Sequence, residues 1–404
     1  MGDDELPIRL PRVLISAFAC GPGDEPEANA GWAFVTAAAA DHEVWVFARR
    51  RFAPAVDAAL QTHPELAKRI HMEYLDLADS VVARARRARD VYWYYTLWQR
   101  EFTRRARRLH ADIGFDLVHH VTWANDWLPC GARSVAPGVP LVWGPVGGAT
   151  RIPLWRLRRW LGARGTRTEL LRAVATWLPR RIWGDGMARR AAVVVVQNRD
   201  VAERFRRARR IVVEPNAALE DLSPRVPRLD AADGTERRAV FVARLIGLKA
   251  PRLAVAAVAR LPHWRLDFYG AGYERRPVEA LATKLGVSDR VAFHGHRPRS
   301  EVLDAMRGAD ALLFPSVHDQ AGWAVAEASS IGTPVVCLPL GGPPVLAERN
   351  GYIAPIEGDV VWNVANALED AVTNGGVPHR RWSRDRLAPL IRDWYADALR
   401  SATI

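Results

Sequence analysis

Cysteine is scarce in this sequence. The 404 residues include only Cys20, Cys130 and Cys337. An odd, scattered set of three excludes a disulfide framework and indicates a reducing compartment. No histidines accompany them at the spacing of a zinc site, so we expect no metal site.

Long apolar runs are also missing. The longest wholly apolar stretches, such as Ala191 to Val196, are far shorter than the roughly 20 residues of a membrane-spanning helix. The chain does not open on a charged segment followed by an apolar one, so we expect no signal peptide. We expect a cytoplasmic protein, with a place at the inner face of the membrane left open.

Lysine is the third scarce residue. Lys68, Lys249 and Lys284 are the only lysines among 57 Lys plus Arg, and the formal net charge is +12. No nucleic-acid module or motif is present, so we expect no nucleic-acid partner. Two segments, Val81 to His110 and Pro153 to Trp183, interleave Arg with Trp, Tyr and Leu, as interfacial helices do. Peripheral contact with an anionic membrane and plain solvated crossover helices both remain open.

The length and composition indicate two globular α/β domains. The chain is 404 residues long, with 49% hydrophobic and 25% charged residues, which suits two domains of about 200 residues each. Strands alternate with helical stretches, which predicts two parallel α/β sheets.

The stretch from Pro315 to Gly342 is the most informative segment. It has the pattern of a strand end, a polar loop, a short helix opening near Gly322, another strand and a Gly-Gly loop. The first N–H groups of such a helix suit a diphosphate. Asp319 and Glu327 stand eight residues apart, roughly 12 Å at helical rise. We expect these carboxylates to bind sugar hydroxyls, Asp319 on a transferred sugar and Glu327 on a ribose.

A complementary basic segment lies about seventy residues upstream. The apolar run from Ala239 to Ala243 predicts a buried strand, and Arg244 and Lys249 follow its carboxyl end, where open α/β sheets bind ligands. A lysine kept in so arginine-rich a chain hints at a point charge on phosphate. We expect both cations to contact a diphosphate; cations that merely pair with nearby Asp or Glu are the alternative.

These segments together resemble the retaining family-4 glycosyltransferases, group 1, of the GT-B fold. Six motifs of that family stand in order here: ARLIGLKA (Ala243 to Ala250), DFYGAG (Asp267 to Gly272), VAFHG (Val291 to Gly295), ADALLFPS (Ala309 to Ser316), the acidic pair Asp319 to Glu327, and GTPVVCLPLGG (Gly332 to Gly342). Ala243, Asp319 and Gln320 depart from the family pattern, where Gly, Glu and Gly are usual.

The amino-terminal half extends the resemblance over nearly the whole chain. It contains DLVHHVTWANDWLP and VPLVWGPVGGA, and a glycine-rich acidic loop followed by a helix that we expect to open near Asn29 to Gly31. The implied fold has two Rossmann-like α/β/α domains facing across a cleft. Residues 1–216 would bind the acceptor and residues 217–384 the nucleotide sugar. Residues 385–404 would form a helix that packs back on the first domain.

The resemblance implies transfer of a sugar from a UDP- or GDP-linked donor to an acceptor hydroxyl, with retention of the anomeric configuration and without a cofactor or metal. The expected acceptors are a lipid-linked, polysaccharide or small natural-product hydroxyl. A GT-B nucleotide-sugar epimerase and a catalytically weakened sugar-nucleotide-binding partner are the alternatives. The departures at Ala243, Asp319 and Gln320 motivate the second of these.

The resemblance also assigns candidate site residues. The catalytic candidates are Asp319, Arg244, Lys249 and His120. The donor-binding candidates are Gly31, Arg244, Lys249, Gly270, Gly272, Phe293, Gly295, His296, Asp319, Ala321, Gly322, Trp323 and Glu327. The acceptor-side candidates are His119, Thr122, Gly147 and Gly148.

Overall fold

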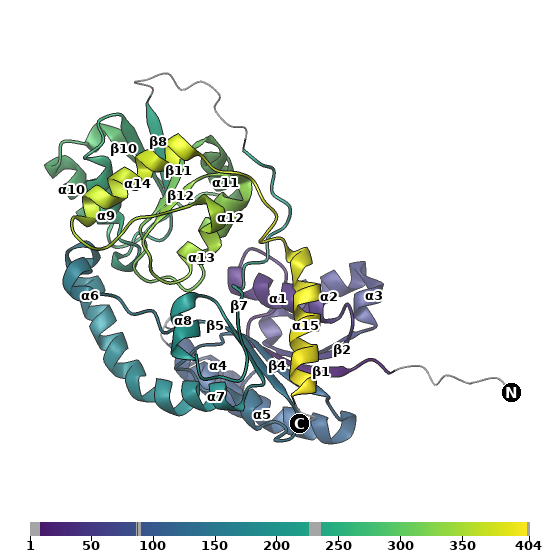
Figure 1. Cartoon of the computed structure of the whole chain (residues 1–404). Coiled ribbons are helices and arrows are strands. Elements are labelled where there is room, and N and C mark those ends of the chain that lie inside the picture. The colour runs from purple at the N-terminus through teal and green to yellow at the C-terminus, as the bar shows by residue number, and fades with distance from the viewer. Residues whose placement is uncertain (1–8, 86, 88–89, 226–235, 402–404) are drawn as a thin grey trace.

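The structure is a computed structural model that describes residues 9–85, 87, 90–225 and 236–401. Two α/β domains, each built on one sheet, lie one above the other in Figure 1. The first sheet has the order β3-β2-β1-β4-β5-β6-β7. Its strands are β1 (Arg12–Ala17), β2 (Glu43–Ala48), β3 (Ile70–Tyr74), β4 (Leu117–Thr122), β5 (Leu141–Val146), β6 (Val193–Val196) and β7 (Ile211–Val213).

The second sheet has the order β10-β9-β8-β11-β12-β13. Its strands are β8 (Arg237–Val242), β9 (Trp264–Tyr269), β10 (Val291–Gly295), β11 (Ala311–Phe314), β12 (Val335–Cys337) and β13 (Gly351–Ile353). The paired strands of both sheets run parallel. The predicted fold class, two Rossmann-like parallel α/β domains, is therefore confirmed.

Apolar strands account for both sheets. Alternate residues of β1 pack in two different cores, Val13 and Ile15 in one and Leu14 in the other. Strand β11 behaves in the same way, with Leu313 on one side of its sheet and Leu312 on the other. Parallel sheets covered on both faces need such continuous apolar strands.

Helices cover the faces of the two sheets. The first half of the chain contains α1 (Pro26–Ala38), α2 (Ala53–Thr62), α3 (Pro64–Ala67), α4 (Asp79–Val82), α5 (Val91–Ile113), α6 (Leu154–Pro179), α7 (Asp185–Arg190) and α8 (Arg199–Arg204). The second half contains α9 (Pro251–Val258), α10 (Arg275–Lys284), α11 (Arg299–Gly308), α12 (Trp323–Ile331), α13 (Pro343–Ala347), α14 (Val360–Asn374) and α15 (Leu387–Arg400).

Helix α1 begins earlier than the sequence analysis placed it. It starts at Pro26 rather than near Asn29 to Gly31. Proline suits the first turn of a helix because its missing N–H would have no partner there. The glycine-rich loop after β1 is correspondingly shorter than expected.

The last helix returns to the first domain, as predicted. In α15, Leu387, Ile391 and Trp394 are buried in the core that also holds Val13 and Ile15 of β1. Figure 1 shows α15, in yellow, beside α1 in the lower domain. The domain ranges 1–216, 217–384 and 385–404 stay a prediction.

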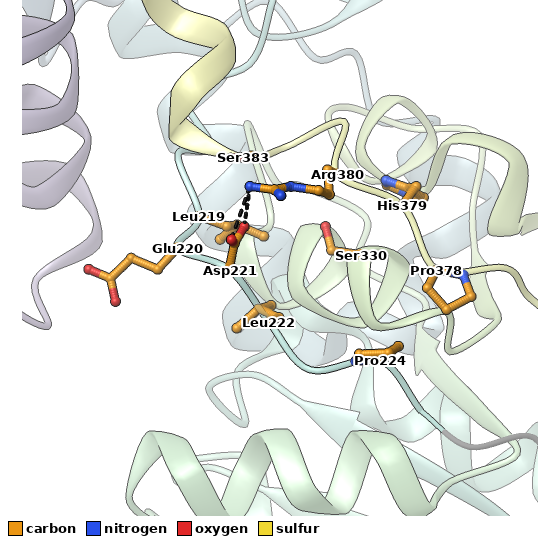
Figure 2. A pocket seen from close by; sticks show the side chains of 10 residues that line it. All are labelled: Leu219, Glu220, Asp221, Leu222, Pro224, Ser330, Pro378, His379, Arg380 and Ser383. Carbon is orange, nitrogen blue, oxygen red and sulfur yellow. Dashed lines mark hydrogen bonds and ion pairs between the residues drawn. The ribbon is translucent and has the colours of Figure 1, made fainter.

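The chain crosses twice between the domains at one place. Leu219 donates its backbone N–H to Trp382 (2.8 Å), and Arg384 donates to Leu219 (2.9 Å). A cavity lies between the two crossing segments, and its lining includes the ion pair of Asp221 with Arg380 at 2.7 Å (Figure 2). None of the residues predicted for the donor or acceptor lines this cavity.

Helix α6 connects the two domains along the outside of the molecule (Figure 1). A kink at Gly162 divides it. Before the kink, Leu157, Trp160 and Leu161 are buried in the core of the second domain, which the sequence did not reveal. After the kink, much of the helix faces solvent. No helix in the described part of the chain has both the length and the apolar character needed to span a membrane.

Candidate active site

The two loops with the clearest donor motifs meet at one edge of the second sheet. Strands β8 and β11 are neighbours, and the loops formed by residues 243–250 and 315–322 leave their carboxyl ends. The strand order reverses between β8 and β11, and open parallel sheets bind ligands at such a point. The loops after β1 and β4 stand at the corresponding point of the first sheet.

Lys249 and Asp319 form an ion pair across the two loops of the second sheet. Their side chains are only 13% and 17% exposed, so water screens the pair weakly. Lys249 also lies over the ring of Phe314, with its Nζ 5.3 Å from the ring centroid. Arg244 is exposed and forms no ion pair with any residue that the structure describes. The loop after β8 thus offers one paired and one unpaired cation.

Close backbone approaches fix the loop that carries Arg244. The Leu245 N–H donates to Ala271 at 2.9 Å. A Cβ atom at Gly270 or Gly272 would collide with the backbone of Ala243 or Leu245, respectively. These two predicted glycines therefore support the shape of the cation loop by letting another loop pack against it.

Glu327 stands on α12, which begins next to Gly322 as predicted. Gly322 caps the helix in the left-handed conformation, with φ of 85°. Arg299 donates from its Nε to Glu327 at 2.8 Å. Burial raises the pKa of the Glu327 carboxyl, and the positive charge of Arg299 opposes that rise.

The remaining donor candidates of the second domain lie in two places. Ala321 and Trp323 pack partly buried against its core. Phe293 stacks on Phe268 with ring centroids 5.0 Å apart. Gly295 accepts a backbone hydrogen bond from Gly270 at 2.7 Å, and His296 beside it is exposed.

Gln320 bridges the two domains, which the sequence analysis did not foresee. Its Oε1 accepts from the Gly148 N–H at 2.6 Å, and its backbone carbonyl accepts from the Asn198 side chain at 3.2 Å. The Thr150 hydroxyl lies 3.4 Å from its Nε2. Because Gln320 follows Asp319, these contacts lie at the point where the strand order of the second sheet reverses, between β8 and β11. The only signal in the sequence was the departure from the family's glycine.

The glycines of the first domain are closely packed. Gly31 lies in α1, where a Cβ atom would collide with the Ala19 carbonyl. Thr122 accepts from the Ala19 N–H at 3.0 Å. Gly147 packs against the Gln320 side chain, and a Cβ atom at Gly148 would collide with Asp126. The loop of Gly147 and Gly148, the acceptor-side candidates, therefore packs against Gln320 of the second domain.

Both candidate histidines are buried and fully hydrogen-bonded. The ring nitrogens of His119 lie 2.8 Å from the Tyr395 hydroxyl and 2.9 Å from the Gly144 carbonyl. Those of His120 lie 3.1 Å from the Tyr95 hydroxyl and 3.0 Å from the Ser16 hydroxyl. Burial lowers the pKa of His119 to about 4 and that of His120 to about 3, so both rings are neutral near pH 7.

A half-buried carboxylate between the domains, Glu27, was also missed. Glu27 accepts from the Trp123 N–H at 2.7 Å and from the Asn216 side chain at 3.1 Å. Asn216 accepts in turn from the Trp323 indole at 3.3 Å. Burial raises the pKa of Glu27. The chain of bonds connects the first turn of α1 to the first turn of α12.

Helix α6 contacts both of these loops of the second sheet, residues 243–250 and 315–322, from outside. A Cβ atom at Gly247 would collide with the Leu161 carbonyl, so helix and cation loop are in tight contact. Further along, Glu169 pairs with His318 at 3.0 Å, next to Asp319. Across the described ranges, no group of three or more His, Cys, Asp or Glu side chains is arranged to hold a metal ion.

Two parallel Rossmann-like domains with facing loops and a returning last helix define the GT-B architecture. Known structures agree: sucrose-phosphate synthase from Thermosynechococcus elongatus is similar with a TM-score of 0.60 and 17% identity, covering 97% of this chain and 100% of that one. The lipopolysaccharide outer core galactosyltransferase WaaB is similar with a TM-score of 0.59 and 14% identity, covering 97% of this chain and 99% of that one.

Sequence comparison gives the family. Residues 227–383 match the family described as glycosyl transferases group 1. A D-inositol 3-phosphate glycosyltransferase from Mycobacteroides abscessus is 28% identical over 316 residues, covering 74% of this chain and 68% of that protein. A 2-deoxystreptamine glucosyltransferase from Streptomyces kanamyceticus is 33% identical over 195 residues, which are 46% of this chain and 49% of that protein. The carboxyl-terminal part of the chain thus matches this family, and the predicted resemblance to the group 1 glycosyltransferases is confirmed.

Proposed function

We propose that this protein transfers a sugar from a UDP- or GDP-linked donor to an acceptor hydroxyl, with retention of the anomeric configuration. The observation that carries the proposal is the meeting of Lys249, Asp319 and exposed Arg244 at the switch point between β8 and β11. Cations fixed beside a diphosphate stabilise the charge that gathers on it as the sugar leaves. The carboxylate beside them would accept hydrogen bonds from the sugar hydroxyls.

Glu327 would hold the other end of the donor. Glu327 lies in the second turn of α12. The free N–H groups and the dipole at the start of this helix favour the negative charge of a diphosphate. Arg299 keeps one carboxylate oxygen of Glu327 in place at 2.8 Å. Glu327 would then accept hydrogen bonds from the ribose hydroxyls.

The acceptor would be deprotonated without a histidine. His119 and His120 have both ring nitrogens engaged inside the first domain, so we leave them out of the reaction. We propose that a β-phosphate oxygen of the donor takes the acceptor's proton. The acceptor oxygen then bonds to the anomeric carbon on the face from which the diphosphate departs, which retains the configuration. Arg244 and Lys249 would supply the positive charge, so we propose that no metal is required.

We propose further that the protein contacts an anionic membrane through α6 from a cytoplasmic position. After the kink, the exposed apolar residues of this helix recur at the spacing of a single helical face. They are Leu170, Leu171, Val174, Trp177 and Leu178, which we call the α6 stripe. Val174 is 79% exposed, and exposed Arg167 and Arg181 flank the stripe. Such a combination of apolar and cationic side chains suits an anionic lipid surface.

Two measurements test these proposals. Incubation with UDP- and GDP-sugars and a panel of hydroxyl acceptors, with EDTA and without, should give a product whose anomeric configuration matches the donor by NMR. Nucleotide binding without transfer to any acceptor would favour the weakened-partner alternative, and a product epimerised in the nucleotide sugar would favour the epimerase. Sedimentation with phosphatidylglycerol vesicles should fall at least fivefold in Val174→Ser/Leu178→Ser; equal sedimentation would contradict the membrane proposal.

A further inference from the structure

A second basic site lies beside the cleft, outside the residues assigned to the donor. It is a cavity between the second half of α6, the turn at Arg180–Gly184 and α8. Its acidic lining residues are Asp200 and Glu203. Its basic lining residues are all arginines: Arg151, Arg180, Arg181, Arg204 and Arg206. The lining therefore has more positive than negative side chains.

Carboxylates neutralise only part of this arginine cavity. The buried carboxylate of Asp126 lies 3.0 Å from the Nε of Arg180 and 3.3 Å from the Nε of Arg204. Glu203 pairs with Arg206 at 3.1 Å. Among the described residues, no carboxylate pairs with Arg151 or Arg181.

Asp126 does more than balance charge. It is fully buried, and Ala149 donates its N–H to it at 3.2 Å. One carboxylate thus ties Arg180 and Arg204 to the loop at Gly148. Among the described residues, Asp126 is the one carboxylate that pairs with Arg180, and it lies nearest to the Nε. A guanidinium held beside a single carboxylate keeps further N–H donors, and such donors suit a phosphate group.

Two lining residues connect the arginine cavity to the second domain. Ala149, which lines it, follows Gly148, the residue bonded to Gln320 at 2.6 Å. Asp200, also in the lining, accepts from the Gly341 N–H of the second domain at 3.2 Å. The cavity lining is therefore connected to the second domain through Asp200, and it adjoins the residue that binds Gln320.

We infer that the arginine cavity binds a phosphate group of the acceptor, so that the acceptor is a phosphorylated molecule. The inference rests on the proposed function, because it assigns the second substrate of the same cleft. Unpaired Arg151 and Arg181 supply the charge, and Arg180 supplies the fixed guanidinium. The phosphate anchors the acceptor at the side of the first domain, and its hydroxyl extends past Gly148 toward the donor.

Two sources of that phosphate are compatible with the surface. Trp177 belongs both to the cavity lining and to the α6 stripe, and Arg181 lies over its ring at 4.4 Å. The tail of a lipid phosphate would continue from the cavity onto the stripe. A water-soluble sugar phosphate would use the cavity alone.

Calorimetric titration with inorganic phosphate and with dodecyl phosphate below its micelle concentration tests the inference. The protein is first saturated with the nucleoside diphosphate that stabilises it, so that the donor site is closed to both probes. The cavity variant Arg151→Ala/Arg181→Ala should bind both probes at least tenfold more weakly than wild type. The control variant Arg207→Ala/Arg209→Ala, which removes two exposed arginines outside the lining, should stay within twofold.

The outcomes separate the possibilities. A lipid phosphate is supported if dodecyl phosphate binds tenfold more tightly than inorganic phosphate and this difference in affinity is lost in Val174→Ser/Leu178→Ser. Equal affinities for the two probes support a soluble phosphate. Equal losses in the cavity and control variants, or no loss in either, overturn the inference. If no nucleotide binds but phosphate binding still depends on Arg151 and Arg181, the phosphate site stands and the proposed function fails.

Discussion

The two domains share one architecture but present different chemistry at their facing edges. The second domain places an ion pair, an unpaired arginine and a buried glutamate along one crevice. The corresponding edge of the first domain has two neutral, hydrogen-bonded histidines and the tightly packed loop of Gly147 and Gly148. A cluster of charged side chains of the first domain lies in the arginine cavity instead. A nucleoside diphosphate requires charged groups at a fixed spacing, whereas an acceptor of unknown structure sets no such spacing. For this reason only the second domain, the proposed donor side, has a motif pattern that the sequence reveals.

Among the substitutions considered, Asp319→Asn in the second domain should have the largest effect on the rate of sugar transfer. The amide keeps the shape but loses the charge that would stabilise the transferring sugar, so we expect transfer to fall by about 100-fold, roughly 2.7 kcal/mol. Nucleoside diphosphate affinity should stay within about threefold, because Lys249 would be released from its ion pair to the phosphates. Single-turnover kinetics and calorimetry measure the two quantities. A large loss of nucleotide affinity with unchanged transfer would place Asp319 at the wrong end of the donor.

Glu327→Gln should weaken nucleotide binding itself. The loss of charge-assisted hydrogen bonds to the ribose should cost about 2 kcal/mol, or roughly 30-fold in Kd. Glu301→Gln, an exposed carboxylate on α11, is the matched control and should bind like wild type. Calorimetry with the free nucleoside diphosphate is the measurement, and wild-type affinity in Glu327→Gln would exclude the ribose assignment.

Gln320→Gly tests whether the hydrogen bonds of Gln320 between the two domains contribute to catalysis with the acceptor. Restoring the family's glycine removes the contacts with Gly148 and Thr150 but no predicted donor contact. We expect kcat/KM for the acceptor to fall by about tenfold, or 1.4 kcal/mol. Nucleotide Kd should change by less than about twofold, since the variant leaves the cations untouched. A shift confined to nucleotide affinity would contradict the bridging role.

The smallest expected effect is a pH shift. The proposed ribose binding would need the Glu327 carboxylate in its charged form, and burial raises the pKa of this group above the ordinary 4.5. Nucleotide affinity should therefore decline as the pH falls, starting at a higher pH than for an exposed glutamate. Arg299→Ala should move this decline to a still higher pH, because Arg299 lowers the pKa. Binding isotherms between pH 4 and pH 8 measure the shift, and superimposable profiles of the two proteins would contradict it.

Sequence reasoning reached the fold and much of the second domain. The apolar run at Ala239 to Ala243 predicted strand β8, and the resemblance to the family implied the return of the last helix. The sequence placed Lys249 and Asp319 at strand ends on one edge of a parallel sheet. Their ion pair corresponds to the alternative left open for the cations, pairing with a nearby acidic residue. These features depend on local pattern, which the sequence records directly.

The features that were missed depend on contacts between distant segments. Glu27 was indistinguishable in the sequence from its solvated neighbours, yet it binds Trp123 and Asn216. The two Arg-rich segments had similar composition. In α5, Tyr94, Trp98 and Phe102 are buried in the core, whereas the second half of α6 keeps its apolar stripe exposed. Composition alone does not say which face of a helix is covered.

Thermal unfolding with UDP, GDP, dTDP and ADP, in wild type and Glu327→Gln and with or without EDTA, tests the central claim most directly. A ligand at a hundred times its Kd stabilises the folded protein by about 2.7 kcal/mol. The donor site proposed here predicts that one nucleoside diphosphate raises the melting temperature of wild type, that EDTA leaves the rise unchanged, and that Glu327→Gln largely loses it. No rise with any nucleotide, or an equal rise in the variant, would contradict a donor site built on the second domain.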